Sequence, residues 1–217
     1  MDAATEVTER LKELCSRHSE TRKAVNLLTD LFERRFETRT TAKPPAALLL
    51  GTSTREMEKV AETLADRMGR PLIRCYCGQY GPQVFTYAMV GVAPVYVGGP
   101  GFLTSAVKAQ PNAIVVFDDF QAVTGSSDVW TVVDEILCGS LIDRRSGEEV
   151  DASGVVVLFA VEVGEAAEEI ATRSRVDPTE VNTCGNEALR YLYRHIVSAK
   201  GDFPIDYMDA VCDLVPR

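Results

Sequence analysis

The sequence predicts an α/β protein in which helices cover both faces of a mostly parallel sheet. Short, wholly apolar runs, which are typical of buried parallel strands, alternate along the chain with segments of helical periodicity. Strands that alternate with helices favour a parallel sheet, because each crossover helix returns the chain to the same end of the sheet. At 217 residues the chain is long enough to bury a sizeable core.

The first part of the chain has the pattern of two helices. Apolar residues recur at helical spacing across residues 6–36, with a break at 16–19. A polar stretch at 37–45 ends in two prolines and leads into the all-apolar residues 46–50. We expect this run to form the first buried strand.

The middle of the chain repeats the alternation. Helical periodicity at 56–68 precedes an apolar run at 72–77, which predicts a helix and a second strand. Glycines and prolines are dense in 78–101, so we expect mostly loop and short turns there. Residues 102–109 predict a helix and residues 113–117 a buried strand that is closed by two aspartates.

The last part predicts one more strand among helices. Residues 130–138 have helical periodicity, and residues 147–149 are typical of a hairpin tip. The apolar run at 155–161 predicts a strand, and residues 165–171 and 187–199 predict two helices.

Composition and charge exclude several classes of protein. Asp and Glu number 32 against 23 for Lys and Arg, so the net charge is -9 and a nucleic-acid partner is not expected. The apolar runs are far shorter than the roughly 20 residues of a membrane span. The acidic start of the chain fits neither a secretory signal nor a transit peptide. We therefore expect a cytoplasmic protein without a membrane partner, although an organellar address is not excluded.

Cysteines and histidines do not form an obvious metal or catalytic site. The six cysteines are scattered, and only Cys75 and Cys77 are close enough to share the face of a strand. No other Cys or His pair completes a zinc spacing, so we expect reduced thiols and no metal. The histidines are His18 and His195 alone, which gives little support to a small-molecule enzyme.

The connection after the first apolar strand lies where a nucleotide-binding protein would carry a phosphate loop of the form G-x-x-x-x-G-K-[ST]. Counted from Gly51 through Thr54, Glu56 takes the later glycine position, Met57 the lysine position and Glu58 the hydroxyl position. Two carboxylates there repel the charges of a triphosphate. Taken alone, the position is also consistent with a plain strand-to-helix turn that binds no ligand.

The run Val-Gly-Val-Ala-Pro-Val-Tyr-Val-Gly, followed by Leu-Thr-Ser-Ala-Val and a strand ending Phe-Asp-Asp, resembles the Clp-type AAA+ unfoldases and disaggregases. Their second ATPase domain carries Ile-Gly-Ala-Pro-Pro-Gly-Tyr-Val-Gly, a Leu-Thr-x-Ala-Val helix and a strand ending Phe-Asp-Glu. The resemblance extends over residues 11–190 and is strongest in 72–157, where Gly-Ser-Leu-Ile-Asp at 139–143 also falls at family positions.

The resemblance implies an AAA+ P-loop NTPase-like three-layer sandwich. The α/β core is then expected at 41–180, after an N-terminal helical segment at 1–40. Residues 181–217 are expected to form a short C-terminal helical extension, as a truncated or absent helical lid.

The resemblance also assigns site residues. Tyr96, Val97 and Gly98 match the family's aromatic pore loop, which grips a threaded polypeptide. Asp118 matches the Walker B aspartate that holds magnesium. Asp119 stands where the family has the Glu that activates water, and its side chain is one methylene shorter.

Other family elements are altered. Glu162 replaces the sensor Asn that contacts the γ-phosphate region, and Arg175 matches the arginine finger, although a surface arginine explains it equally well. Residues 17–20 do not reproduce the adenine-binding Val-x-Gly-Gln, and no Gly-Ala-Arg sensor follows.

This correlated loss predicts a catalytically inactive domain, a pseudo-ATPase without a cofactor. We expect it to act as a protein-interaction or scaffold module, with protein partners in an AAA+ or another multi-subunit assembly. The alternative is a weak or atypical ATP-binding Clp-like ATPase or chaperone subunit, which would use ATP and magnesium through Asp118 and Asp119.

Overall fold

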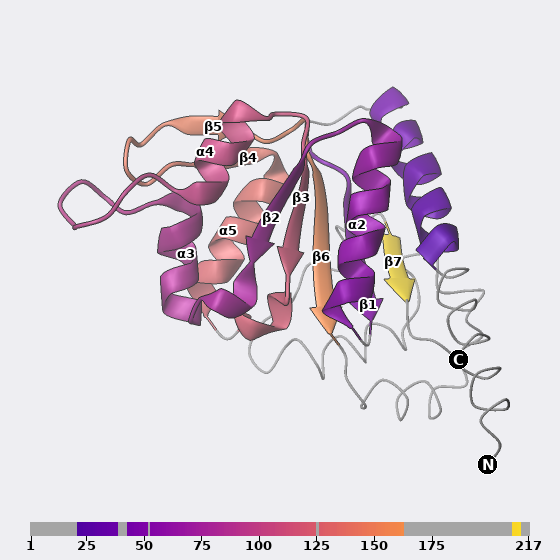
Figure 1. Cartoon of the computed structure of the whole chain (residues 1–217). Helices are drawn as coiled ribbons and strands as arrows, with labels where there is room; N and C mark the ends of the chain where they lie inside the picture. Colours follow the sequence, from indigo (N-terminus) through magenta and orange to yellow (C-terminus); the bar gives the residue numbers. More distant parts are fainter. Residues whose placement is uncertain (1–20, 39–42, 52, 125, 163–209, 214–217) are drawn as a thin grey trace, which may run out of the picture.

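The computed structural model describes residues 21–38, 43–51, 53–124, 126–162 and 210–213, and its centre is a five-stranded sheet (Figure 1). Every neighbouring pair in this sheet is parallel. The spatial order of the strands is β2 (Leu72–Tyr76), β3 (Ile114–Asp118), β6 (Val156–Glu162), β1 (Ala46–Gly51) and β7 (Ala210–Asp213).

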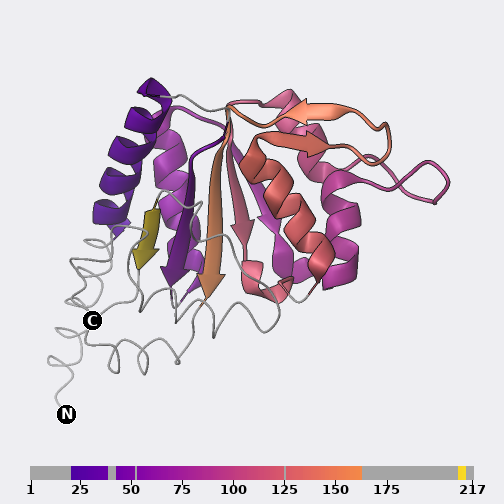
Figure 2. The same cartoon turned by 180° about the vertical axis from the view of Figure 1, so that it is seen from behind.

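Helices cover both faces of the sheet, which confirms the three-layer arrangement. A helix over residues 21–37 and α2 (Thr54–Met68) pack on one face (Figure 2). Three helices pack on the opposite face: α3 (Pro82–Val90), α4 (Phe102–Ala109) and α5 (Ser127–Cys138).

Alternate residues of each central strand enter the two hydrophobic cores. In β6, Phe159 belongs to the core beneath α3, α4 and α5, whereas its neighbour Leu158 belongs to the core beneath α2. Phe159 stacks on Phe117 of β3 with ring centroids 5.1 Å apart. Burying each such side chain contributes roughly 1.5–3 kcal/mol, so the apolar strands of the sequence require cover on both faces.

The parallel strands bring their carboxyl ends to one edge of the sheet. Gly51 ends β1 and pairs with Glu162, the last residue of β6, while Asp118 ends β3. Ligand sites of open α/β sheets lie at this edge. The sequence-predicted site residues of these three strands are therefore neighbours in space.

The prediction of a mostly irregular segment at 78–101 was wrong in its first half. Residues 77–79 form a 3-10 turn, and α3 follows directly, beginning at Pro82 and ending before Gly91. Phe85 and Met89 are buried on its inner face. Glycine and proline lie at the ends of this helix, where they are favourable, and not in its interior.

Several predicted boundaries shift. Helix α2 begins at Thr54 and α5 at Ser127, where Ser126 caps the helix by accepting a hydrogen bond from the Asp128 amide. A hairpin is confirmed between β4 (Ser140–Ile142) and β5 (Glu149–Asp151), but Glu149 already belongs to the strand and not to the tip.

Strand β7 is a second correction. The sequence analysis placed residues 210–213 in a helical extension, but they pair with β1 and extend the sheet. The domain bounds at 1–40, 41–180 and 181–217 otherwise stay a prediction.

Other predicted features lie outside the described residues. These are the first helix and its break at 16–19, the helices at 165–171 and 187–199, and Arg175. Across the part of the chain that the structure describes, no helix is long and apolar enough to cross a membrane.

Candidate functional site

The β1–α2 connection contains only two residues. β1 ends at Gly51 and α2 begins at Thr54, so residues 54–56 are already helical. A phosphate loop instead keeps these positions as open backbone whose N–H groups surround the phosphates. The short connection leaves little backbone for such a cradle.

Met57, at the lysine position, lies in the hydrophobic core. Its side chain is 0% exposed and belongs to the cluster that joins α2 to the sheet and to the helix over 21–37. A phosphate-binding lysine must instead reach out of the helix to the β and γ phosphates. The position is therefore used for packing in this chain.

The N-terminus of α2 faces a carboxylate of the chain itself. Thr54 Oγ1 donates a hydrogen bond of 2.9 Å to Glu162 Oε2. The Glu162 amide in turn donates to Gln121 Oε1 at 3.2 Å. Helix N-termini favour negative charge, so Glu162 stands where an anion would otherwise be stabilised.

Asp118 is a buried carboxyl group at the end of β3. It is 1% exposed, and within the described part of the chain neither of its oxygens has a hydrogen-bond partner. Burial raises its pKa to about 6; Arg74 opposes the shift, while Glu58 and Asp119 add to it. Burial therefore favours the neutral form of this side chain.

The carboxylate of Asp119 lies between Gln121 and Gly78. Its backbone is left-handed with φ 55° and ψ 40°, a conformation that costs a non-glycine residue roughly 1–2 kcal/mol. Gln121 Nε2 donates to Asp119 Oδ1, and Gly78 leaves room for the other oxygen, since a Cβ there would lie 2.1 Å from Asp119 Oδ2. Burial and the charge of Glu162 raise the Asp119 pKa, against the effect of the Gln121 bond.

Arg74 of β2 is a positive charge that acts on Asp118. Its guanidinium lies 2.7 Å from Glu62 Oε1 and 3.4 Å from Glu58 Oε1, both on α2. The sequence analysis did not select Arg74 as a site residue. Its partners come from a different element, which spacing along the chain does not reveal.

A second site lies at the other end of the molecule. Residues 91–101, here called the tyrosine loop, connect α3 to α4 and project from the body of the protein (Figure 1). Val95, Tyr96 and Val97 are 83%, 67% and 105% exposed. Gly98 lies against Val92, since a Cβ there would meet Val92 Cγ2 at 2.3 Å. Three neighbouring apolar side chains are thus presented to solvent.

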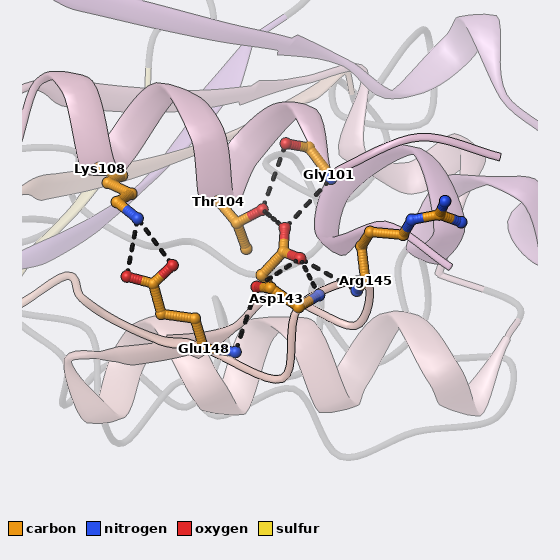
Figure 3. A network of polar contacts seen from close by, with 7 residues as sticks. Gly101, Thr104, Lys108, Asp143, Arg145 and Glu148 are labelled. Atoms are coloured by element: carbon orange, nitrogen blue, oxygen red, sulfur yellow. Dashed lines mark hydrogen bonds and ion pairs between the residues drawn. The ribbon is translucent and has the colours of Figure 1, made fainter. Parts of the chain in front are cut away.

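A residue of the β4–β5 hairpin that the sequence analysis did not select lies against the base of the tyrosine loop. Asp143, at the end of the β4 strand, is 7% exposed and accepts hydrogen bonds from Thr104 and Gly101 (Figure 3). The only sequence signal was its place in Gly-Ser-Leu-Ile-Asp. In the described ranges no group of three His, Cys, Asp or Glu side chains could hold a metal ion.

Comparison with known proteins finds similar sequences among ClpB chaperones. No protein-family model matches the sequence. ClpB of Mycobacterium leprae is 28% identical over 172 residues, covering 74% of this chain and 20% of that protein. ClpB 1 of Parasynechococcus marenigrum is 25% identical over 178 residues, covering 79% of this chain and 20% of that protein.

The chain is similar in sequence to ClpB chaperones at modest identity. It spans about a fifth of the length of these curated relatives.

The solved structures agree on the AAA+ fold. A closed-state cryo-EM reconstruction of Hsp104 with ATPyS and FITC casein superimposes with a TM-score of 0.68 at 17% identity, covering 95% of this chain and 36% of that one. The extended conformation of the S. cerevisiae Hsp104:casein complex has the same TM-score. The protein thus has an AAA+ fold similar to that of Hsp104, as the sequence resemblance predicted.

Proposed function

We propose that this AAA+ domain is a pseudo-ATPase that works as a protein-interaction module. The observation that carries the first half is the burial of Met57. A magnesium triphosphate needs an ammonium group and open backbone at the start of the helix after the first strand. The β1–α2 connection offers a core methionine and helical backbone instead.

Charge at the same edge supports this proposal. Glu58, Asp118, Asp119 and Glu162 carry carboxyl groups there, and Arg74 is already engaged by α2. Each additional negative charge of a nucleotide is repelled by several kcal/mol in a partly dry site. The residues of the edge therefore do not fit a magnesium triphosphate, and no catalytic step is assigned to them.

The tyrosine loop supports the second half of the proposal. Exposed apolar side chains that gather on a projecting segment mark interaction sites, because burying them against a partner is favourable. The Hsp104 structures contain casein in complex with that protein. We infer that the partner of this chain is likewise a polypeptide that contacts Tyr96.

The alternative, a weak ATP-binding Clp-like chaperone subunit, has one observation in its favour. The buried carboxyl of Asp118 remains at the end of β3 without a hydrogen-bond partner among the described residues. Calorimetric titration with ATP and ADP in the presence of magnesium distinguishes the two. We expect no saturable binding at millimolar nucleotide, and a micromolar dissociation constant would replace the pseudo-ATPase with the alternative.

A matched pair of variants tests the interaction module. Tyr96 and Tyr87 are both exposed tyrosines, at 67% and 57%, but Tyr87 lies on α3. We expect Tyr96→Ala to weaken the binding of fluorescein-labelled casein about tenfold, or about 1.4 kcal/mol, and Tyr87→Ala to leave it unchanged. Fluorescence anisotropy measures both. Equal affinities for the two variants would remove the tyrosine loop from the proposal.

A further inference from the structure

The two ends of the tyrosine loop lie against the β4–β5 hairpin. Asp143 Oδ2 accepts hydrogen bonds from Thr104 Oγ1 at 2.7 Å and from the Gly101 amide at 3.3 Å, where the loop enters α4 (Figure 3). The Arg144 amide donates to the Val90 carbonyl at 2.7 Å, where the loop leaves α3. A single hairpin therefore contacts both ends of the loop.

The other oxygen of Asp143 organises the hairpin turn. Asp143 Oδ1 accepts from the amides of Arg145 and Ser146 at 3.0 and 2.9 Å and from Ser146 Oγ at 3.1 Å. Burial alone raises the pKa of this carboxyl, but the hydrogen bonds from Thr104, Ser146 and Gly101 outweigh it and lower the pKa to about 2. The group is thus ionised at neutral pH and is held by charge-assisted hydrogen bonds.

The two ends of the tyrosine loop, here called its neck, pack too closely to admit a Cβ at either glycine. A Cβ on Gly91 would lie 2.8 Å from the Gly101 nitrogen, and a Cβ on Gly101 would lie 2.3 Å from the Met89 carbonyl oxygen. The two backbone segments of the neck, at Gly91 and Gly101, are therefore in direct contact. Further out, Arg145 Nη1 donates to the Tyr96 carbonyl at 3.4 Å, so the hairpin also reaches the loop tip.

We propose that Asp143 is the positioning residue of the tyrosine loop, because one buried carboxylate joins the loop base, α4 and the hairpin turn into a single unit that fixes the direction of Tyr96. The proposal rests on the proposed function only for what the loop binds. The order of the loop can be measured independently of that function. Asp143 is not expected to contact the bound polypeptide.

The first test measures loop order directly. We expect Asp143→Asn to lower the heteronuclear ¹⁵N NOE of the amides at 94–99 and to speed hydrogen exchange of the Gly101 and Ser146 amides at least tenfold. Thr104→Val removes one donor and is expected to act in the same direction. Thr104→Ser keeps the hydroxyl but loses the methyl group. We expect it to retain the wild-type values, whereas a role in packing alone predicts that it loosens the loop.

Two control variants separate the carboxylate from more general effects. Lys108→Met breaks the exposed ion pair with Glu148, at 2.7 Å, that also links α4 to the hairpin. Asp134→Asn makes the same chemical change on the exposed side of α5. We expect both to leave the loop amides unchanged. Loosening by Lys108→Met equal to that by Asp143→Asn would overturn the assignment, as would wild-type loop order in Asp143→Asn.

The second test links order to binding. We expect Asp143→Asn, or Thr104→Val if the first variant does not fold, to weaken casein binding at least threefold, with Asp134→Asn unaffected. Failure of wild-type protein to bind casein would contradict the proposed function, yet the NMR comparison would still decide the role of Asp143. A disordered loop with unchanged casein affinity would show that the positioning has no consequence for binding and would overturn that part.

Discussion

Glu162 at the end of β6 accepts a hydrogen bond from Thr54 Oγ1 in the first turn of α2, with 2.9 Å between the oxygens. The anion-favouring N-terminus of α2 thus faces a carboxylate from the same chain. Family members carry an Asn at the Glu162 position, as the resemblance implies. By that resemblance, a charged side chain is expected where those proteins have a neutral one.

Replacing Glu162 by Gln is expected to destabilise the domain slightly. Loss of a negative charge near a helix N-terminus costs about 0.3–1 kcal/mol when the charge is exposed, as Glu162 is. Urea unfolding measures the change, and Glu33→Gln, an exposed carboxylate on the helix over 21–37, is the control. A destabilisation that is the same in both variants would contradict a specific role for the Thr54 contact.

Restoring a lysine at position 57 is expected to harm the fold without creating a nucleotide site. Because Met57 is 0% exposed, Met57→Lys places an ammonium in the core at a cost of about 3–5 kcal/mol. Met57→Leu keeps the volume and is expected to cost less than about 1.5 kcal/mol. Urea unfolding compares the two.

The double variant Met57→Lys with Glu58→Thr restores the motif in sequence. We expect no magnesium-ATP binding by calorimetry, since residues 54–56 stay helical. Saturable micromolar binding by this variant would show that the rest of a nucleotide site survives.

Asp118 predicts a fall in stability as the pH rises. Its pKa is about 6 in the folded chain against an ordinary value of 3.8, so the folded state binds the proton more tightly. The stabilisation is complete below pH 3.8 and is lost as the pH passes through 6, by about 1–2 kcal/mol between pH 5 and 8.

Urea unfolding across this pH range checks the direction. The difference in stability between wild type and Asp118→Asn should change with pH across this range. A wild-type curve parallel to that of Asp118→Asn would mean that Asp118 does not titrate in this range.

Replacing either of two nearby glycines of the tyrosine loop by alanine is expected to change stability by very different amounts. Gly101→Ala puts a Cβ 2.3 Å from a backbone oxygen, so the neck must open, at an expected cost above about 2 kcal/mol. At Gly99 a Cβ meets nothing within 4 Å, and Gly99→Ala should change stability by less than about 0.5 kcal/mol. Thermal unfolding measures both, and comparable losses would contradict the close approach.

Local pattern was sufficient for β1, β2, β3 and β6 and for the described helices other than α3, but not for β7. The apolar runs that became β1, β3 and β6 are recognisable because strands buried on both faces cannot carry polar residues. Helix α3 was missed because Pro82 and Gly91 are typical of loops. Only the burial of Phe85, which the structure shows, identifies the segment between them as a packed helix. Once that burial is known, Pro82 and Gly91 are recognisable as the two ends of a helix.

The amino-acid sequence by itself determined the layered α/β fold, the family resemblance and the substitution of Met57 and Glu58 at the phosphate-loop positions, because each depends on residue type and short-range spacing. Tertiary structure alone decided the contacts between distant segments. Thr54 meets Glu162 across 108 positions, and Asp143 meets Gly101 across 42. Such contacts depend on the order and register of the strands, because these bring segments that are distant in the sequence to the same place.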